Sequence, residues 1–410
     1  MELHNGQYCI QEIPITDLSE KYGLPLYVYD TAIIKRQYNR LVNAFDVKRL
    51  VINYACKALT NISILRFIRS LGAHADTVSL GEIQLCLRAG FLPEEIVFTP
   101  SAVSIEEYKK AMELGVRINI DNLETLAYFA DHKITYPVCV RINPHIMAGG
   151  NKKISTGHID SKFGISIHQL DSILNYVENS HLNIEGIHMH TGSDILDVEV
   201  FLQATDILFK AAGHFSDLNY VDFGSGFKVK YKPEDIETDI DLFGREMSRK
   251  FNRFCEERNK DITLMFEPGK FIVSESGIFL ARTNIIKHSP SNLFAGLDTG
   301  FNHLIRPMFY DSYHEIINAS NPHGDKKYYS VVGYICETDN FAWNRPIPEI
   351  SAGDILAFKN AGAYCFQMAS NYNSRIRPAE VLIHEGKDYL IREREELEDL
   401  FRHQTDQIRF

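Results

Sequence analysis

Residues with reactive side chains stand at the ends of several short apolar runs in this sequence. Lys57 directly follows Val51–Cys56, a run that we expect to be buried. A lysine held partly out of water has a lowered pKa and can form a Schiff base with an aldehyde cofactor. It can equally lay its aliphatic stem along an apolar surface and leave its ammonium group in water. Lys57 by itself does not distinguish these two roles.

Two other strand ends favour the cofactor. The turn Gly224-Ser225-Gly226 follows Tyr220–Phe223, and backbone N–H groups in such a turn can hold a phosphate group. Glu267 follows Ile262–Phe266, where its carboxylate could pair with a protonated ring nitrogen. Each feature is common alone. Together with the lysine, they favour an aldehyde cofactor that carries a phosphate group and a ring nitrogen.

A metal site is the alternative interpretation of this region. His188 and His190 lie on one face of the expected strand Ile184–Met189, with a spacing found in metal ligands. Asp222 and Glu267 could complete the ligand set of a barrel hydrolase. Equally, one histidine could pack inside a barrel and the other could cap its mouth. Because a metal leaves the lysine and the glycine turn unexplained, we expect no metal ion.

The elements that position these residues follow from the alternation of apolar runs with amphipathic stretches, which is typical of βα units. Eight strands are expected, at Val51–Cys56, His74–Val78, Ile96–Thr99, Arg117–Ile120, Pro137–Ile142, Ile184–Met189, Tyr220–Phe223 and Ile262–Phe266. This pattern predicts a (β/α)8 barrel over residues 33–287, with the active site at the carboxyl ends of its strands. Those ends also carry Asp76, Asp121 and Arg141.

A second, β-rich domain is expected outside the barrel. After Ile286 the strand-like runs are not separated by long helices; they are Leu293–Leu297, Tyr328–Ile335, Ile355–Phe358 and Glu380–His384. The strand-like run Pro25–Tyr29 precedes the barrel and could complete this domain. We therefore predict a β-barrel or sandwich made of residues 1–32 and 288–410, and a fold class of α/β plus β.

Composition excludes several classes of partner. The net charge of −11 and the lack of a dense Lys/Arg block argue against nucleic acid. No run approaches the roughly 18 apolar residues of a membrane span. The first residues lack the basic-then-apolar order of a secretory signal, so we expect a cytoplasmic protein without membrane contact. The seven cysteines are scattered without C-x-x-C spacing, which suggests neither a disulfide framework nor a zinc site.

With these residues in place, the sequence resembles the fold-type III pyridoxal-phosphate-dependent decarboxylases, and within them the diaminopimelate decarboxylases. The resemblance extends over nearly the whole chain. Its ordered blocks are Tyr54–Ala58, Asp76–Glu82, Arg141–Pro144, Ser161–Ile165, His190–Ser193, Asp222–Gly226, Glu267–Gly269, Arg306–Tyr310, Cys336–Thr338, Gly362–Tyr364 and Met368–Glu380. So many blocks in one order are hard to obtain by chance.

The resemblance implies roles in binding pyridoxal 5′-phosphate. Lys57 binds the cofactor covalently, His190 stacks on its ring, and Glu267 pairs with its ring nitrogen. A carboxylate at that nitrogen makes the cofactor a strong electron sink and favours decarboxylation over racemisation. The residues expected at the phosphate group are Ser193, Gly224, Ser225, Gly226 and Tyr364, and the other cofactor-binding candidates in matching blocks are Asp76, Arg141 and Gly269.

Residues outside the barrel are assigned by the same resemblance. Cys336 resembles the family's proton donor, which in relatives reaches the site of the partner subunit and so implies a homodimer with shared sites. Without the resemblance, a buried strand cysteine would be the simpler interpretation. Glu337 resembles the partner of the substrate's distal ammonium group. The other substrate-binding candidates are Lys270, Arg306, Tyr310 and Tyr364.

These assignments predict an enzyme, a carboxy-lyase that converts meso-2,6-diaminopimelate to L-lysine and CO2 as the last step of lysine biosynthesis. Ornithine or lysine would leave the distal carboxylate clamp unpaired. Lys270 stands where the family has arginine, and Cys336-Glu337-Thr338-Asp339 is one residue shorter than the usual motif, so the clamp geometry stays open. The alternatives are a decarboxylase of carboxynorspermidine, ornithine or lysine, and a non-catalytic binding protein of this fold.

Overall fold

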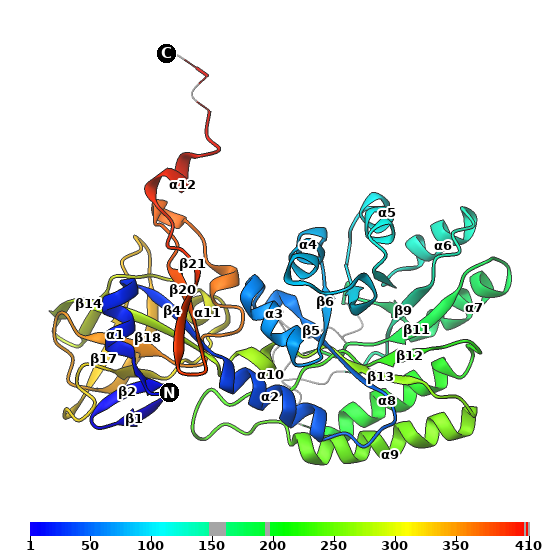
Figure 1. The fold of residues 1–410 in the computed structure, drawn as a ribbon, viewed down its shortest axis with the longest axis horizontal. Helices are drawn as coiled ribbons and strands as arrows, with labels where there is room; N and C mark the ends of the chain where they lie inside the picture. Colours follow the sequence, from blue (N-terminus) through cyan, green and yellow to red (C-terminus); the bar gives the residue numbers. More distant parts are fainter. Residues whose placement is uncertain (147–160, 193–196, 406, 409–410) are drawn as a thin grey trace. The chain divides into compact units, whose positions relative to one another are not determined.

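The computed structural model describes residues 1–146, 161–192, 197–405 and 407–408. The chain divides into two compact units (Figure 1). Unit 1 contains residues 1–34, 231–233 and 273–410, and unit 2 contains residues 35–230 and 234–272. Most of the long connection 144–161 and the candidate Ser193 lie outside the described residues. No helix in the described part of the chain is both long and apolar enough to cross a membrane.

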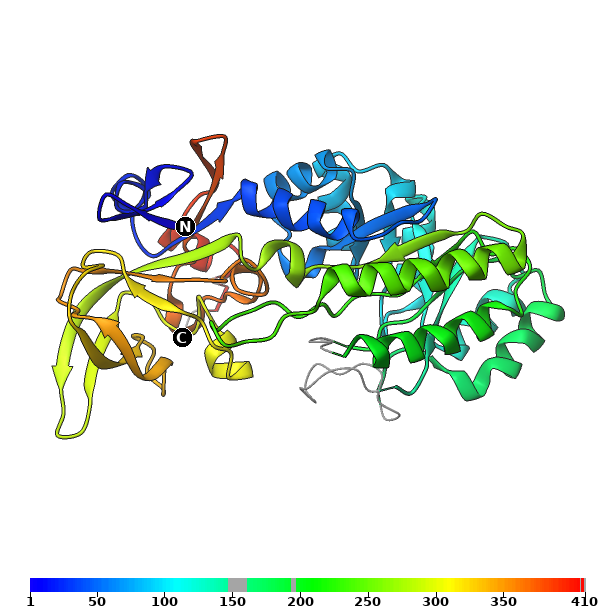
Figure 2. The same cartoon turned by 90° about the horizontal axis from the view of Figure 1, so that it is seen from below.

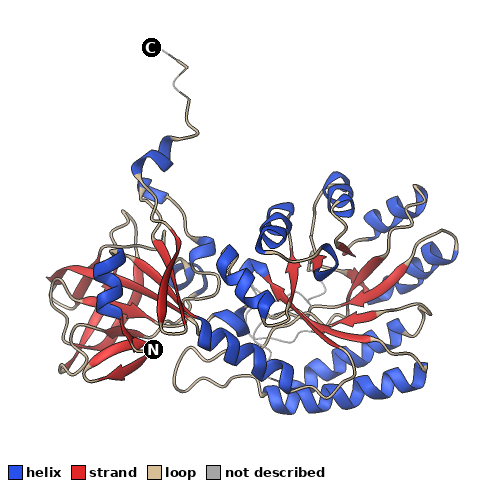
Figure 3. Cartoon of the chain, in the orientation of Figure 1, coloured by secondary structure: helices blue, strands red, loops and turns tan. Residues whose placement is uncertain are grey.

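Unit 2 is a closed barrel of parallel strands with helices outside them (Figure 3). Its eight strands are β5 (Leu50–Ala55), β6 (His74–Thr77), β7 (Ile96–Phe98), β8 (Arg117–Ile120), β9 (Val138–Asn143), β11 (Ile184–His188), β12 (Tyr220–Asp222) and β13 (Thr263–Phe266). They neighbour one another in the order β9-β11-β12-β13-β5-β6-β7-β8, and β8 pairs with β9 to close the ring. The short β10 (Ile165–Ser166) also pairs with β9. The predicted barrel is therefore confirmed, and each strand lies within a residue of its expected ends.

Several helices of the barrel begin at residues whose side chains cap them. They are α2 (Thr31–Asn43), α3 (Ile62–Ser70), α4 (Leu80–Ala89), α5 (Ile105–Glu113), α6 (Leu123–Asp131), α7 (Leu170–Glu178), α8 (Val198–Ala212) and α9 (Ile240–Arg258). The side chains of Asn61, Ser79, Ser104 and Asn122 each accept a backbone N–H at a helix start, which satisfies a donor that the helix cannot. Helices α8 and α9 run side by side (Figures 1 and 2).

Unit 1 is rich in β-structure, as predicted. Its main sheet runs in the order β18-β17-β15-β14-β4-β20-β21, and β19 joins β14 to β16. These strands are β4 (Leu26–Asp30), β14 (Gly277–His288), β15 (Leu293–Leu297), β16 (Ile316–Asn318), β17 (Lys326–Val332), β18 (Asn340–Pro348), β19 (Ile355–Phe358), β20 (Ala379–His384) and β21 (Lys387–Arg392). A separate three-stranded sheet contains β1 (Glu2–His4), β2 (Gln7–Ile10) and β3 (Ile13–Pro14). The short helices of this unit are α1 (Ile15–Tyr22), α11 (Arg306–Tyr310) and α12 (Leu397–Phe401), whereas α10 (Lys270–Val273) lies in unit 2 except for its last residue.

Two sequence expectations about unit 1 need comment. The expected strand Tyr328–Ile335 is wrong at its end, because β17 stops at Val332 and a turn follows. The domain boundary after residue 287 stays a prediction. In the structure, residues 273–287 lie in unit 1, since β14 pairs with β4 and β19 of that unit.

Candidate active site

Lys57 lies at the carboxyl end of the barrel, in the single 3-10 turn Cys56–Ala58 that follows β5. Its Nζ atom is 3.7 Å from Oδ2 of Asp76, the third residue of β6. The lysine side chain is 43% exposed, whereas that of Asp76 is 1% exposed. Burial raises the pKa of Asp76 to about 6, and the charge of Glu267 adds to this rise while Lys57 opposes it. Lys57 thus combines access to solvent with a buried carboxylate partner.

Glu267 follows β13 and is buried. Its Oε2 atom is 3.1 Å from Nε2 of His188. Its Oε1 atom is buried and has no hydrogen bond of ordinary geometry to a described residue. Burial raises the pKa of Glu267, against the charges of Lys57 and Arg141. A buried carboxylate oxygen without a partner is costly, so this atom fits a donor supplied by a ligand, such as a protonated ring nitrogen.

Gly269 brings the segment after β13 against the segment that carries Lys57. A Cβ atom at Gly269 would lie 3.0 Å from both the Ala55 oxygen and the Ala58 Cβ. The N–H of Ala55 also donates to the Pro268 oxygen at 3.2 Å. A glycine is therefore needed here for close approach. The lysine and Glu267 consequently share one end of the barrel.

The glycine turn after β12 is fixed by side chains of the barrel. Asp222 Oδ1 accepts the Gly224 N–H at 2.9 Å, and Asp222 Oδ2 accepts from Asn53 Nδ2 at 3.0 Å. The Ser225 N–H donates to Nδ1 of His190 at 3.1 Å. Two backbone donors of the turn are therefore bound to side chains, and their expected role at the phosphate group stays a prediction. Gly226, the last residue of the turn, has a φ of +133°.

His190 is held as a neutral imidazole. Burial lowers its pKa well below the usual value, and the charges of Arg141 and Lys57 add to the effect. Its Nδ1 accepts a hydrogen bond, which agrees with an uncharged ring. Arg141, on β9, is itself buried, with its guanidinium 4.9 Å from the centre of the Phe163 ring. A neutral ring at this place suits stacking on an aromatic cofactor.

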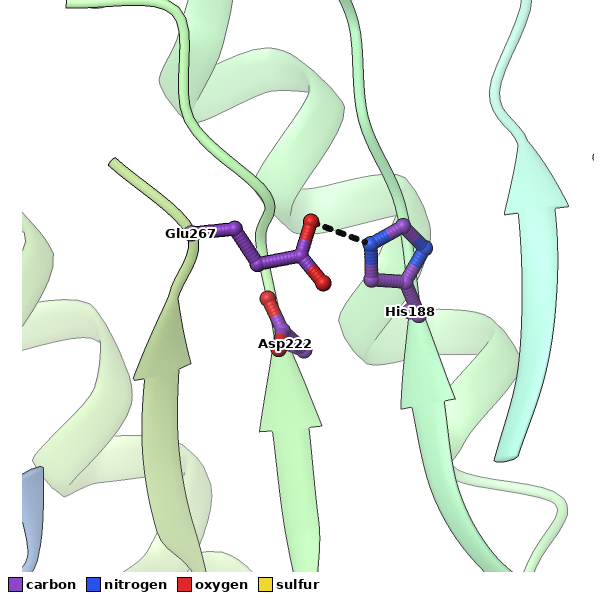
Figure 4. Close-up of side chains that lie close together, drawn as sticks. All are labelled: His188, Asp222 and Glu267. Carbon is purple, nitrogen blue, oxygen red and sulfur yellow. Dashed lines mark hydrogen bonds and ion pairs between the residues drawn. The ribbon is translucent and has the colours of Figure 1, made fainter. Parts of the chain in front are cut away.

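The group that could hold a metal ion consists of His188, Asp222 and Glu267, whose ligand atoms lie within 4.8 Å of one another. Figure 4 shows Glu267 and His188 facing each other across this group. His190, the fourth ligand considered from sequence, is not a member. The oxygens of Asp222 accept hydrogen bonds from Asn53 and Gly224, and Glu267 Oε2 binds His188. Most ligand atoms of this group thus have protein partners. The cofactor interpretation instead uses Glu267 Oε1, to which no described residue makes a hydrogen bond of ordinary geometry.

The remaining candidates lie mostly in unit 1. Arg306 begins α11, is buried, and lies 5.4 Å from the Tyr231 ring centre and 5.9 Å from that of Tyr310. Its Nη2 donates to Ser312 Oγ at 3.3 Å. Tyr364 has a φ of +56°. Lys270 begins α10 and belongs to unit 2.

Cys336 and Glu337 lie in the turn after β17, and both are exposed. The buried strand cysteine considered as an alternative is therefore wrong for Cys336. In the described part of the chain, Cys336 is the exposed cysteine, while the other six are buried or partly buried. The thiol of Cys336 and the carboxylate of Glu337 are therefore both open to solvent in this chain.

Sequence reasoning missed two residues at the barrel mouth. Asn53 is an amide within an otherwise apolar strand, and it fixes Asp222 by the hydrogen bond given above. Glu82 caps the start of α4 by accepting the Val78 N–H at 2.8 Å, and burial raises its pKa to about 7. A polar residue inside an apolar run could have indicated Asn53. Glu82 follows Ser79 at the spacing of a capping box, so the sequence indicates only a capping role for it. The spacing does not show that its carboxylate also contributes to the charges near Lys57.

Comparison with known proteins defines the class first. A family model described as "Pyridoxal-dependent decarboxylase, pyridoxal binding domain" matches residues 31–274. This match covers the barrel with Lys57 and Glu267. The protein is a pyridoxal-dependent decarboxylase, with pyridoxal 5′-phosphate as its cofactor and an amino acid as its substrate class.

The relatives narrow the class. The diaminopimelate decarboxylase of Methanothermobacter thermautotrophicus is 40% identical, over 98% of this chain and 96% of its own length. The structure of diaminopimelate decarboxylase from Helicobacter pylori complexed with L-lysine is 32% identical with a TM-score of 0.87, and the match covers 95% of this chain and 98% of that one. A lysine/ornithine decarboxylase structure from Vibrio vulnificus has a TM-score of 0.79 at 22% identity, over 90% of this chain and 97% of that one, which shows the fold alone. The chain belongs to the diaminopimelate decarboxylase family.

Proposed function

We propose that this protein removes one carboxyl group from meso-2,6-diaminopimelate and so produces L-lysine and CO2, the last step of lysine biosynthesis. The observation that carries the proposal is the buried Glu267 Oε1 atom, to which no described residue makes a hydrogen bond of ordinary geometry, at the barrel end that also carries Lys57, in a chain of this family. This carboxylate oxygen gains a hydrogen-bond partner when the protonated ring nitrogen of a cofactor supplies the donor.

Pyridoxal phosphate, when bound, supplies an electron sink for the bonding pair that the departing carboxylate leaves behind. Lys57 would hold the cofactor covalently, and Asp76 Oδ2, 3.7 Å from the lysine Nζ atom, can pair with the ammonium group of the free lysine. Glu267 would keep a proton on the ring nitrogen, and its bond to His188 sets the direction of its carboxylate. His190 is neutral and would cover one face of the ring. Together, Asp76 and Glu267 would stabilise positive charge on the lysine ammonium group and on the ring nitrogen, and His190 would add no charge.

The residues of unit 1 would choose the substrate. The Arg306 guanidinium can bind the distal carboxylate in a bidentate manner, while the Glu337 carboxylate can bind the distal ammonium group. The Cys336 thiol would donate the proton to the carbon that loses CO2. Ornithine and lysine lack the distal carboxylate, so they could not form this bidentate pair with Arg306.

We further propose a homodimer in which Cys336 and Glu337 complete the partner's site, and a cytoplasmic location. Support for the dimer is the exposure of both residues in the single chain. Support for the location is that every described cysteine is a free thiol, as is usual in a reducing compartment. Sedimentation of the holoenzyme would reveal the dimer. Mixing an inactive Lys57→Ala chain with an inactive Cys336→Ala chain should restore activity if sites are shared.

The test of the reaction is CO2 release from meso-diaminopimelate compared with L-ornithine, L-lysine and carboxynorspermidine. A preference for a substrate without the distal carboxylate would contradict the proposal. Borohydride treatment of the holoenzyme should abolish activity and leave a pyridoxyl group on the peptide with Lys57, whereas the inactive Lys57→Ala variant should carry no pyridoxyl group after the same treatment. The metal alternative makes the opposite prediction, because a chelator rather than borohydride would then abolish activity.

A further inference from the structure

A segment of unit 1 that has no role so far, Tyr372–Ser374, contacts the turn that carries Cys336 and Glu337. Asn373 Oδ1 accepts the backbone N–H of Cys336 at 3.2 Å. Tyr372 Oη donates to Oε1 of Glu337. Two neighbouring side chains of one segment therefore bind two neighbouring residues of the other. We call residues 333–339 the Cys336 turn.

The base of the Cys336 turn is fixed by Asp339. Its Oδ1 accepts the Phe301 N–H at 2.8 Å, and its Oδ2 accepts the Ile335 N–H at 2.9 Å. Its backbone oxygen accepts the Gly333 N–H at 2.8 Å. A Cβ atom at Gly333 would lie 2.1 Å from Asp339 Oδ2, so glycine allows this close packing. The base is thus held by three hydrogen bonds, while Cys336, Glu337 and Thr338 at its tip are exposed.

The segment Tyr372–Ser374 is itself well supported. The Tyr372 ring stacks on Phe301, with centroids 5.7 Å apart and planes 25° apart. Asn371 Nδ2 donates to the Arg375 oxygen at 3.0 Å across the segment. Asn373 has a φ of +56°, a left-handed conformation that asparagine adopts more readily than most residues. Phe301 contributes to both supports, because its N–H binds Asp339 and its ring carries Tyr372.

We propose that Tyr372 and Asn373 are positioning residues of the active site. Asn373 holds the backbone from which the Cys336 thiol projects. Tyr372 holds one oxygen of Glu337 and directs the other, Oε2, to the distal ammonium group of the substrate. This inference rests on the proposed function, since it takes Cys336 as the proton donor and Glu337 as the ammonium partner.

The two residues should affect different kinetic constants. Tyr372→Phe removes a hydrogen bond to the group that binds substrate, so KM for diaminopimelate should rise about tenfold with kcat within about twofold. Asn373→Gly keeps the left-handed backbone but removes the acceptor, so kcat should fall about fivefold while KM stays within about twofold. Asn373→Asp retains an acceptor oxygen and should recover most of the lost kcat.

Matched controls come from the same unit. Tyr328 is an exposed tyrosine on β17, and Asn344 is an exposed asparagine on β18 with a φ of +45°. Tyr328→Phe and Asn344→Gly should leave both constants unchanged, and thermal melts should show that all five variants are folded.

Two outcomes overturn the inference alone, and a third overturns it together with the proposed function. One is that KM and kcat are altered by similar factors within each of the two variants, Tyr372→Phe and Asn373→Gly. This is the result expected if each substitution only loosens the surrounding structure. The other is that both variants behave like the controls while the wild-type enzyme is active, which refutes the positioning role alone. A wild-type protein that releases no CO2 from diaminopimelate refutes the proposed function and, with it, this inference.

Discussion

Replacing Gly224 with alanine tests whether the turn after β12 lies against the cofactor. Gly224 has a φ of +60°, and a Cβ atom there would lie 2.5 Å from His190 Nδ1 and 2.8 Å from the Met189 oxygen. The left-handed backbone costs an alanine about 1–2 kcal/mol. Crowding in a packed site costs a further 1–3 kcal/mol or so. His190 or the turn must therefore shift.

Gly386→Ala is the matched control, since Gly386 has a φ of +71° and open space within 4 Å of the added Cβ. Gly386→Ala therefore has the energetic cost of a left-handed backbone, but its new Cβ atom does not crowd a neighbouring atom. If the crowding displaces groups that bind the cofactor, Gly224→Ala should weaken pyridoxal phosphate binding by about 5-fold to 150-fold, and Gly386→Ala should not. The assay is a spectroscopic titration of each cofactor-free variant with pyridoxal phosphate, after thermal melts confirm folding. Equal affinity of the two variants would refute the reasoning.

Two further predictions concern buried carboxylates of the barrel. Glu267→Gln keeps the shape of the side chain but removes the charge that would hold a proton on the ring nitrogen, so kcat at saturating cofactor should fall roughly 100-fold; a change of less than about twofold would contradict that role. Burial raises the pKa of Asp76 from 3.8 to about 6, so the folded state holds this proton more tightly than the unfolded state, and stability should fall as pH rises through this window. The shift corresponds to roughly 3 kcal/mol. In urea unfolding of the cofactor-free protein, the stability of Asp76→Asn relative to the wild type should therefore increase by up to roughly this amount between pH 4 and pH 8. If the free energies of unfolding of the two proteins follow parallel pH profiles, the prediction is refuted.

Much of the fold was predictable because it rests on local properties. Hydrophobic runs and the residues that end them indicated all eight barrel strands, since a strand buried on both faces needs a continuous apolar run. The local sequence is also sufficient for the start of α5, because Ser104 and Glu107 have capping-box spacing, and Ser104 Oγ accepts the Glu107 N–H at 3.4 Å. The end of β17 was missed, because it depends on Asp339 folding back onto the Ile335 N–H.

The sequence by itself determined which reactive residues stand at the strand ends, and so the class of chemistry, because barrel topology carries every strand end to one mouth. Only the tertiary structure decided how these residues are partnered. His188 and Glu267 are 79 positions apart, and Cys336 and Asn373 are 37 apart. Such pairs depend on how strands close into a barrel and how a turn folds onto a distant segment. A hydrogen bond forms only when the donor and acceptor atoms are placed to within a few tenths of an ångström. No local pattern in the sequence specifies atomic positions so closely.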